Sequence, residues 1–211
     1  MSRWQLWLVC AAACCSFITI SMIEPLVPLY SLALGATPIV IGALVSTGYL
    51  LPVFLAVPAG KLVDRWGPRL MLIAGTLGFL VAPSGVALVP GLATLVIAQV
   101  LAGLSQLLVV LAAQSAVALL GEQRHQREYN FGWYSSFVSA GQLIGPLLAG
   151  TLADLSGYRA AFLGAGLVSL ISLALLQKFD PGERRTSPAL ERGRAPAESP
   201  VKALLSDRGL Q

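Results

Sequence analysis

The chain has 211 residues, of which 56% are hydrophobic and 11% charged, and it carries a formal net charge of +4. This balance lies far from that of a soluble globular domain and indicates a membrane protein. Its long unbroken apolar runs favour membrane-spanning helices over the alternating strands of a barrel. The composition therefore predicts an all-α, polytopic membrane protein, whose positive charge reflects membrane topology rather than a nucleic-acid partner.

Six apolar segments are long enough to cross the hydrocarbon core as helices, which takes about 20 residues. They run over 5–34, 39–60, 70–89, 92–120, 131–154 and 160–178. The first contains Cys10, Cys14 and Cys15, which have no histidine or carboxylate beside them at metal-ligand spacing and are interpreted as packing residues. Because this run is longer than the apolar core of a signal peptide, we interpret it as a retained span.

Basic residues gather on one side of the predicted spans. Thirteen of the fourteen Lys and Arg residues share the side of both termini, and Arg159 alone lies on the other. Since cytoplasmic loops collect Lys and Arg, we expect both termini to be cytoplasmic, in a bacterial-type inner membrane. The six-helix domain is expected to occupy 1–178, and the proline-rich, charged segment 179–211 is expected to be a disordered tail or a linker to a further half.

The chain matches itself at an offset of 90 residues. The pattern AGxLxDxxGxR occurs at 59–69 and again at 149–159, each time between the end of one predicted span and the start of the next. Because the copies are three spans apart, they lie on opposite faces of the membrane and the repeat is inverted. The sequence thus predicts two inverted three-helix repeats, with chance matching of common small residues as the alternative. The counterparts are Asp64 and Asp154, Gly67 and Gly157, and Arg69 and Arg159.

The first copy of this pattern, GKLVDRWGPR at 60–69, resembles the signature GxLaDRxGRR that the major facilitator superfamily carries between its second and third helices. Pro68 replaces the first arginine of the final pair. The resemblance implies a gating loop formed by Gly60, Asp64, Arg65, Gly67 and Arg69. We expect the glycines to allow a close helix approach and a turn, the aspartate to cap a helix start, and the arginines to lie at the headgroups.

The fifth predicted span resembles the superfamily's antiporter signature, in which glycines and one Gly-Pro pair recur at fixed spacing. The matching residues are Gly132, Gly141, Gly145, Pro146 and Gly150. Glycines at this spacing favour close helix packing, and the proline permits a bend. The resemblance implies export in exchange for protons, and a tightly packed helix without mechanistic meaning is the alternative.

Glu24 is the only acidic residue well inside an apolar run. An ionisable group at that depth is costly unless it faces a cavity or a partner, so we interpret it as a site of proton exchange or of attraction for a cationic substrate. A hydrated carboxylate near the outer interface is the alternative. Other polar side chains form stripes that serve either a substrate path or helix contacts. These are Gln99, Gln106 and Gln114, then Ser135, Ser139 and Gln142, and Ser16 with Thr19.

Several chemistries are not expected from this sequence. Gln99 stands where family members often carry the arginine of an RxxxG motif, which argues against proton coupling through that arrangement. The single histidine, His125, lies in a loop, and no GxxxxGK[ST] motif is present, so we expect no enzyme activity, cofactor or metal site. The expected partners are the lipid bilayer, a small-molecule substrate, and a second six-helix half or a second copy.

Three accounts of the whole remain open at this point. The chain is a fragment of a twelve-helix exporter, a half that pairs with itself or with another half, or a non-transporting, truncated or regulatory membrane protein. All three fit the same six predicted spans, because the superfamily places its substrate between two such halves.

Overall fold

The computed structural model describes residues 3–121 and 123–179, and within these ranges it contains helices and no strands. In chain order the helices are α1 (Arg3–Ala33), α2 (Pro38–Trp66), α3 (Pro68–Leu88), α4 (Leu92–Leu119) and α5 (Arg124–Gln177). All five are long and apolar enough to cross a membrane. The described part of the chain is therefore all-α, which is consistent with a polytopic membrane protein. The segment predicted as a tail or linker falls outside the described residues from position 180 onward.

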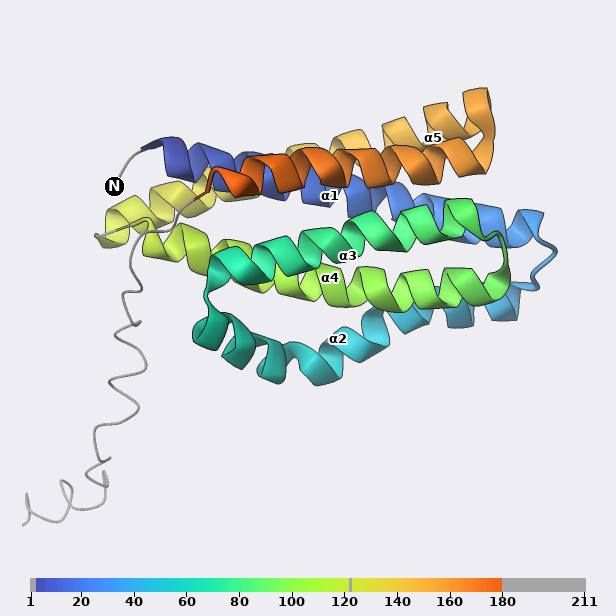
Figure 1. The fold of residues 1–211 in the computed structure, drawn as a ribbon, viewed down its shortest axis with the longest axis horizontal. Coiled ribbons are helices and arrows are strands. Elements are labelled where there is room, and N and C mark those ends of the chain that lie inside the picture. Colours follow the sequence, from blue (N-terminus) through green and yellow to red (C-terminus); the bar gives the residue numbers. More distant parts are fainter. Residues whose placement is uncertain (1–2, 122, 180–211) are drawn as a thin grey trace, which may run out of the picture. The chain divides into compact units, whose positions relative to one another are not determined.

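The last helix, α5, has 54 residues and includes both the fifth and the sixth predicted spans. Within it, Gly157 departs from helical geometry, with φ 80° and ψ 170°. This backbone conformation is accessible essentially to glycine alone. Figure 1 shows the chain turning back there, so α5 consists of a first limb, 124–156, and a second limb, 158–177. Five helices therefore stand in place of the six expected, and the expected sixth helix is the second limb of α5.

The two connections that carry the repeated AGxLxDxxGxR pattern, at 59–69 and 149–159, are mostly helical. α2 continues past its apolar run through Lys61 and Asp64 and ends at Trp66, where Gly67 adopts φ 86°. The first limb of α5 likewise continues through Asp154 as far as Gly157. Polar side chains at the membrane boundary do not interrupt backbone hydrogen bonding, so the end of an apolar run marks the edge of the hydrocarbon and not the end of the helix.

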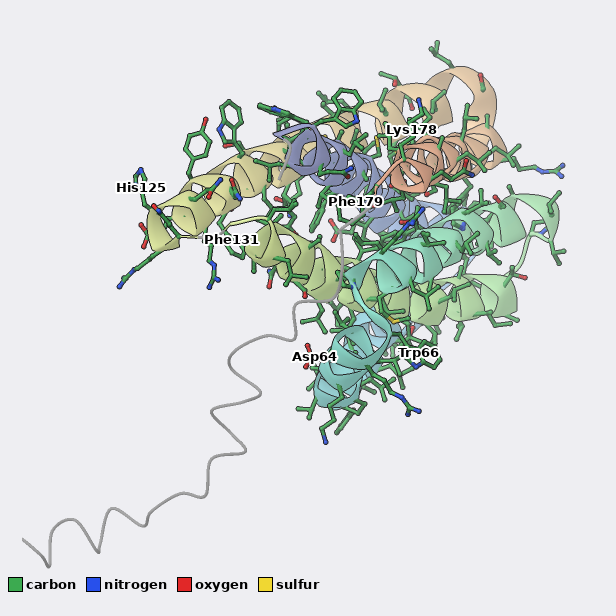
Figure 2. All side chains as sticks on the ribbon, turned by 60° about the vertical axis from the view of Figure 1, so that its left-hand side comes forward. Asp64, Trp66, His125, Phe131, Lys178 and Phe179 are labelled. Carbon is green, nitrogen blue, oxygen red and sulfur yellow. The ribbon has the colours of Figure 1, made fainter. Side chains whose placement is uncertain are left out.

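The start of α5 also lies earlier than the sequence predicts, at Arg124 instead of Phe131. Its first turn is polar, and Arg124 Nε donates to Glu128 Oε1 across 3.0 Å in an exposed i,i+4 ion pair. Figure 2 shows His125 on the same turn, pointing away from the other helices. Such a pair stabilises an exposed helix end by a few tenths of a kcal/mol, about 0.3–0.5.

Small residues take part in the contacts between the helices, together with larger apolar side chains. α1 packs along α5, α3 lies against both α4 and α5, and α2 packs chiefly on α4. Ala112, Ala113 and Ala116 of α4 are completely enclosed. Lipid is as apolar as the side chains it surrounds, so close packing and hydrogen bonds between helices, rather than hydrophobic burial, hold such a bundle together.

α2 is the least enclosed of the five helices. Only 11% of its most apolar stretch is buried inside the structure, whereas 67% of the corresponding stretch of α1 is buried. Pro52 and Pro58 lie within α2, and Figure 1 shows the helix curving along its length. A proline inside a helix removes one backbone hydrogen bond and bends the axis. The contact of α2 with the bundle rests on four buried residues: Leu44, Gly48, Ala59 and Val63.

Candidate functional site

Glu24, the acidic residue predicted to be functional, lies on α1 and is exposed. Pro25 and Pro28 follow it within the same helix. The Tyr49 hydroxyl of α2 donates to Glu24 Oε1 over 3.3 Å, and this hydrogen bond joins the two helices. The bond is long for an O–H donor, so the carboxylate retains most of its capacity to accept a proton or to attract a cation. Glu24 and Tyr49 form the candidate site.

Sequence reasoning identified Glu24 but missed Tyr49, because a tyrosine in an apolar run looks like a packing residue. A signal was nevertheless present. α1 and α2 are joined by a short turn at Gly35, and Glu24 and Tyr49 lie at similar distances from that turn along the two helices. Residues equally far from a tight turn lie at the same depth in antiparallel helices.

Gln99 lies beside this site, at the crossing of α2 and α4. It is buried, and a Cβ added to Gly48 would lie 3.4 Å from its Nε2 atom. One turn along α4, a Cβ added to Gly103 would collide with the carbonyl oxygen of Gly48. The two glycines therefore bring the helix backbones into contact, and Gln99 packs against Gly48 at this crossing.

The other three candidate glutamines are not brought together with Glu24. Gln106 is half-buried on α4, whereas Gln114 on α4 and Gln142 on α5 are exposed. Among the described residues, the hydrogen bond of Glu24 goes to Tyr49 and to none of the glutamines. Ser135 and Ser139, near Gln142, are exposed as well. These polar groups remain candidates for a hydrated surface, and no direct contact connects them to the carboxylate.

Two hydroxyl groups of α1, those of Ser16 and Thr19, contact a neighbouring helix. Thr19 Oγ1 lies 3.0 Å from Ser169 Oγ and donates to the Ala165 carbonyl at 3.2 Å. Ser16 Oγ lies 3.2 Å from Ser172 Oγ. All four hydroxyl residues are buried between α1 and the second limb of α5. The sequence left open whether Ser16 and Thr19 serve a substrate path, and their contacts assign them to packing. Ser169 and Ser172 were missed, although they repeat the three-residue spacing of Ser16 and Thr19.

The glycines of the antiporter-like helix divide into two groups. A Cβ on Gly141 would lie 2.6 Å from the Cys14 carbonyl oxygen, and one on Gly145 would lie 2.7 Å from Ser21 Cβ. These two glycines let α5 approach α1 closely. Gly132 and Gly150 have no such neighbour within 4 Å, and Pro146 is exposed within a continuous helical stretch. Only part of the expected packing motif therefore makes a tight contact.

The expected gating loop is a helix end followed by a one-residue turn. Gly67 supplies the turn, as expected, but no heavy atom would lie within 4 Å of a Cβ on Gly60, so this glycine permits no close approach. Asp64 caps no helix start, because it lies in the last turns of α2 and α3 has no side-chain cap. Figure 2 shows Asp64 at this end of α2, and both Asp64 and Arg65 are exposed.

Arg69, near the start of α3, forms a hydrogen bond with the last residue of α5. Its Nη2 atom donates to the carbonyl oxygen of Gln177 across 3.1 Å. In the second copy of the repeat, Asp154 is exposed, and Arg159 Nε donates to the Ala87 carbonyl at 2.9 Å. Both arginines of the repeated pattern thus bond to the backbone of another helix.

No metal centre is apparent in the part of the chain that the structure describes. No three His, Cys, Asp or Glu side chains there lie close enough together to hold an ion. The three cysteines of α1 are free thiols. At the candidate site, the exposed carboxylate of Glu24 can exchange a proton or attract a cation.

The sequence profile of the Major Facilitator Superfamily matches residues 9–210, nearly the whole chain. The chain belongs to this superfamily. Its members are transporters rather than enzymes, and the helices found here fit a multi-pass membrane protein of that kind.

Two curated relatives match this chain over part of their own length. The quinolone resistance protein NorA of Staphylococcus aureus is 27% identical over 173 residues, covering 81% of this chain and 44% of NorA. An uncharacterized MFS-type transporter of Methanocaldococcus jannaschii is 26% identical over 157 residues, covering 74% of this chain and 40% of that protein. The chain thus spans less than half the length of the curated relatives it matches.

Proposed function

We propose that this chain is one six-helix half of a secondary transporter that exports a small amphipathic or cationic molecule. The observation that carries the proposal is the exposed carboxylate of Glu24 within a spanning helix of a superfamily member. An ionised group on such a helix is costly where it faces hydrocarbon. The side of α1 and α2 that bears Glu24 and Tyr49 therefore faces water or a second half.

In the proposed mechanism, Glu24 exchanges a proton or attracts the cationic group of the substrate. The Tyr49 hydroxyl orients the carboxylate through its hydrogen bond to Oε1. Gln99, at the position where family members often carry arginine, adds no charge beside the crossing. Export in exchange for protons is supported by the glycine pattern of the first limb of α5 and by the similarity to a protein named for quinolone resistance.

We also propose that the helices form six spans in two inverted three-helix repeats. The first repeat is α1, α2 and α3, and the second is α4 with the two limbs of α5. Gly67 and Gly157, which are 90 positions apart, have φ of 86° and 80°, and this agreement supports the pairing. By the bias of basic residues, both termini lie on the cytoplasmic side of an inner membrane.

A second six-helix unit completes the transporter in this proposal, since the superfamily alternates by rocking two halves around a central site. That unit is a further part of the same polypeptide, a separate six-helix half or a second copy of this chain. The size of the native complex in a mild detergent identifies the last case, because a twelve-helix assembly of this chain alone is a dimer.

Dye efflux from cells tests the function. We expect cells that produce the complete transporter to export a cationic dye, and Glu24→Gln to slow the efflux about tenfold or more, since the variant removes the charge. Tyr49→Phe keeps the ring and removes the orienting hydroxyl, so a smaller loss is expected. Glu128→Gln is the matched control, because Glu128 is exposed and pairs with Arg124 on the polar first turn of α5.

Two results would contradict the proposal. Efflux at the wild-type rate in the Glu24→Gln variant would remove the carboxylate from the mechanism. Efflux no faster than in cells without the protein, despite correct membrane insertion and a twelve-helix complex, would exclude export of organic cations altogether.

A further inference from the structure

Two arginines make the same kind of contact at the two ends of one helix pair. Arg69 follows the first residue of α3 and donates to the carbonyl of Gln177, the last residue of α5. Arg159 lies two residues after Gly157, at the start of the second limb of α5, and donates to the carbonyl of Ala87, the residue before the end of α3. Each arginine thus lies at the start of one helix and bonds to the end of the other.

The two contacts correspond in donor and in acceptor. Arg69 and Arg159 are 90 positions apart, and so are the acceptors Ala87 and Gln177. The acceptors differ in residue type and lie outside the repeated AGxLxDxxGxR pattern, so their agreement is independent of the sequence match. The same interaction is therefore made twice. In one contact α3 supplies the arginine and α5 the carbonyl, and in the other the second limb of α5 supplies the arginine and α3 the carbonyl.

The chemistry of a helix end explains why arginine suits this position. The last four carbonyl groups of a helix have no partner within the helix, and its dipole places partial negative charge there. A guanidinium carries a permanent positive charge and several N–H donors on a long side chain, so it can reach a neighbouring helix end. Arg69 and Arg159 each satisfy one of these carbonyls.

The same two helices also contact each other between their ends. A Cβ on Gly166, in the second limb of α5, would lie 2.7 Å from Ser84 Oγ of α3. The pair is therefore joined by an arginine at each end and packed closely at a small residue between them. In contrast, α2 has contacts at a few positions and mostly exposed large side chains.

We propose that Arg69 and Arg159 are positioning residues that brace α3 and the second limb of α5 into one rigid unit. The inference holds whether or not the chain transports a substrate. The proposal also explains why Arg159 is the one basic residue predicted on the side of the membrane opposite to the other thirteen Lys and Arg residues. Arg159 is required there by the end of α3, and its charge serves packing rather than topology.

Hydrogen exchange of the full chain in detergent tests the braces. In Arg159→Gln we expect amides in the last turn of α3 to exchange about tenfold faster, because losing a charged hydrogen bond to a terminal carbonyl weakens the helix end. In Arg69→Gln the faster exchange is expected in the last turn of α5. Each substitution thus acts at the end of the other helix, which a purely local disturbance would not do. Lysine at either position keeps the charge and is expected to restore part of the protection.

Thermal unfolding provides the second measurement. Each glutamine variant is expected to lower the midpoint by about 3–6 °C, and the double variant by the sum, since the two braces are far apart and share no partner. Arg65→Gln is the matched control, because this neighbouring basic side chain is exposed and no backbone contact of it is found among the described residues. Exchange that rises only around the substituted residue, or a control as destabilised as Arg69→Gln, would overturn the proposal.

Discussion

α1 and α2 are similar in length and in apolar character, yet they pack in opposite ways. About two thirds of the most apolar stretch of α1 is buried, against about a tenth for α2. α1 presents small and hydroxyl residues to its neighbours, including Ala12, Ser16 and Thr19. α2 presents Phe54 and Val57 outward, with 72% and 70% of their surface exposed.

This difference shows that hydropathy identifies a spanning helix without telling how deeply it is packed. In lipid, an apolar side chain gains little by turning toward another helix. What draws helices together is a small residue that lets backbones approach, or a polar group that needs a partner. α1 has both kinds along its length, whereas the close contact of α2 with α4 is concentrated at Gly48.

The largest effect on this comparison is expected from Gly103→Ala. The new methyl group would collide with the Gly48 carbonyl and separate α2 from α4. We expect a loss of about 1–3 kcal/mol in the free energy of unfolding, which is typical of overpacking. Unfolding in mixed micelles, followed by circular dichroism, measures it.

Gly150→Ala is the control for this substitution, since a Cβ there meets no heavy atom within 4 Å. The control has the same intrinsic gain in helix propensity and is expected to be neutral or slightly stabilising. Equal stability of the two variants would show that α2 and α4 do not cross at Gly48.

A smaller effect is expected from Thr19→Val, which tests the hydroxyl contacts of α1. The substitution keeps the shape of the side chain and removes the bonds to Ala165 and Ser169. Interhelical bonds of this kind contribute about 0.6 kcal/mol each in membranes, so a loss of about 1 kcal/mol is expected. Thr151→Val removes a hydroxyl bonded only within its own helix and should cost less. If both variants lose the same free energy, the α1 contacts carry no special weight.

The smallest effect is expected from Phe54→Ala on α2. Because the ring is mostly exposed, its removal leaves no cavity, and the free energy of unfolding of the isolated chain should change by less than about 0.5 kcal/mol. The same micelle titration measures it. Phe79→Ala, which removes a buried ring of α3, is the comparison and should be clearly destabilised. A large loss in Phe54→Ala would mean that α2 is as enclosed as α1.

The sequence was sufficient to locate the long apolar helices but not their ends. Apolar runs of about 20 residues, the length needed to cross the hydrocarbon, predicted where these helices lie, and the fifth and sixth runs both fall in α5. The end of α2 at Trp66 was missed, since Lys61 and Asp64 continue the helix beyond the apolar run. The turn at Gly67 was predicted from its residue type, which supplies a positive φ.

Glu24 and Gln99 were singled out from the sequence, whereas Tyr49 was not. Glu24 stood out because a carboxylate in an apolar run is rare. The contacts of Tyr49 and Gln99 depend on how α1, α2 and α4 pack together. The spacing of residues along one helix does not determine that packing. Spacing placed the three glutamines of α4 on one face, but only the position of α2 determines that Gln99 is buried there while Gln114 is exposed.

The two one-residue turns also bear on how the chain enters the membrane during synthesis. In the proposed orientation the turn at Gly157 is translocated, and its one acidic and one basic residue, Asp154 and Arg159, leave it without net charge. The turn at Gly67 has two further cations, Lys61 and Arg65, whose counterparts 90 positions later are Thr151 and Leu155. Because an excess of Lys and Arg favours the cytoplasmic side, these two residues would serve as orientation signals in the proposed topology and distinguish otherwise similar turns.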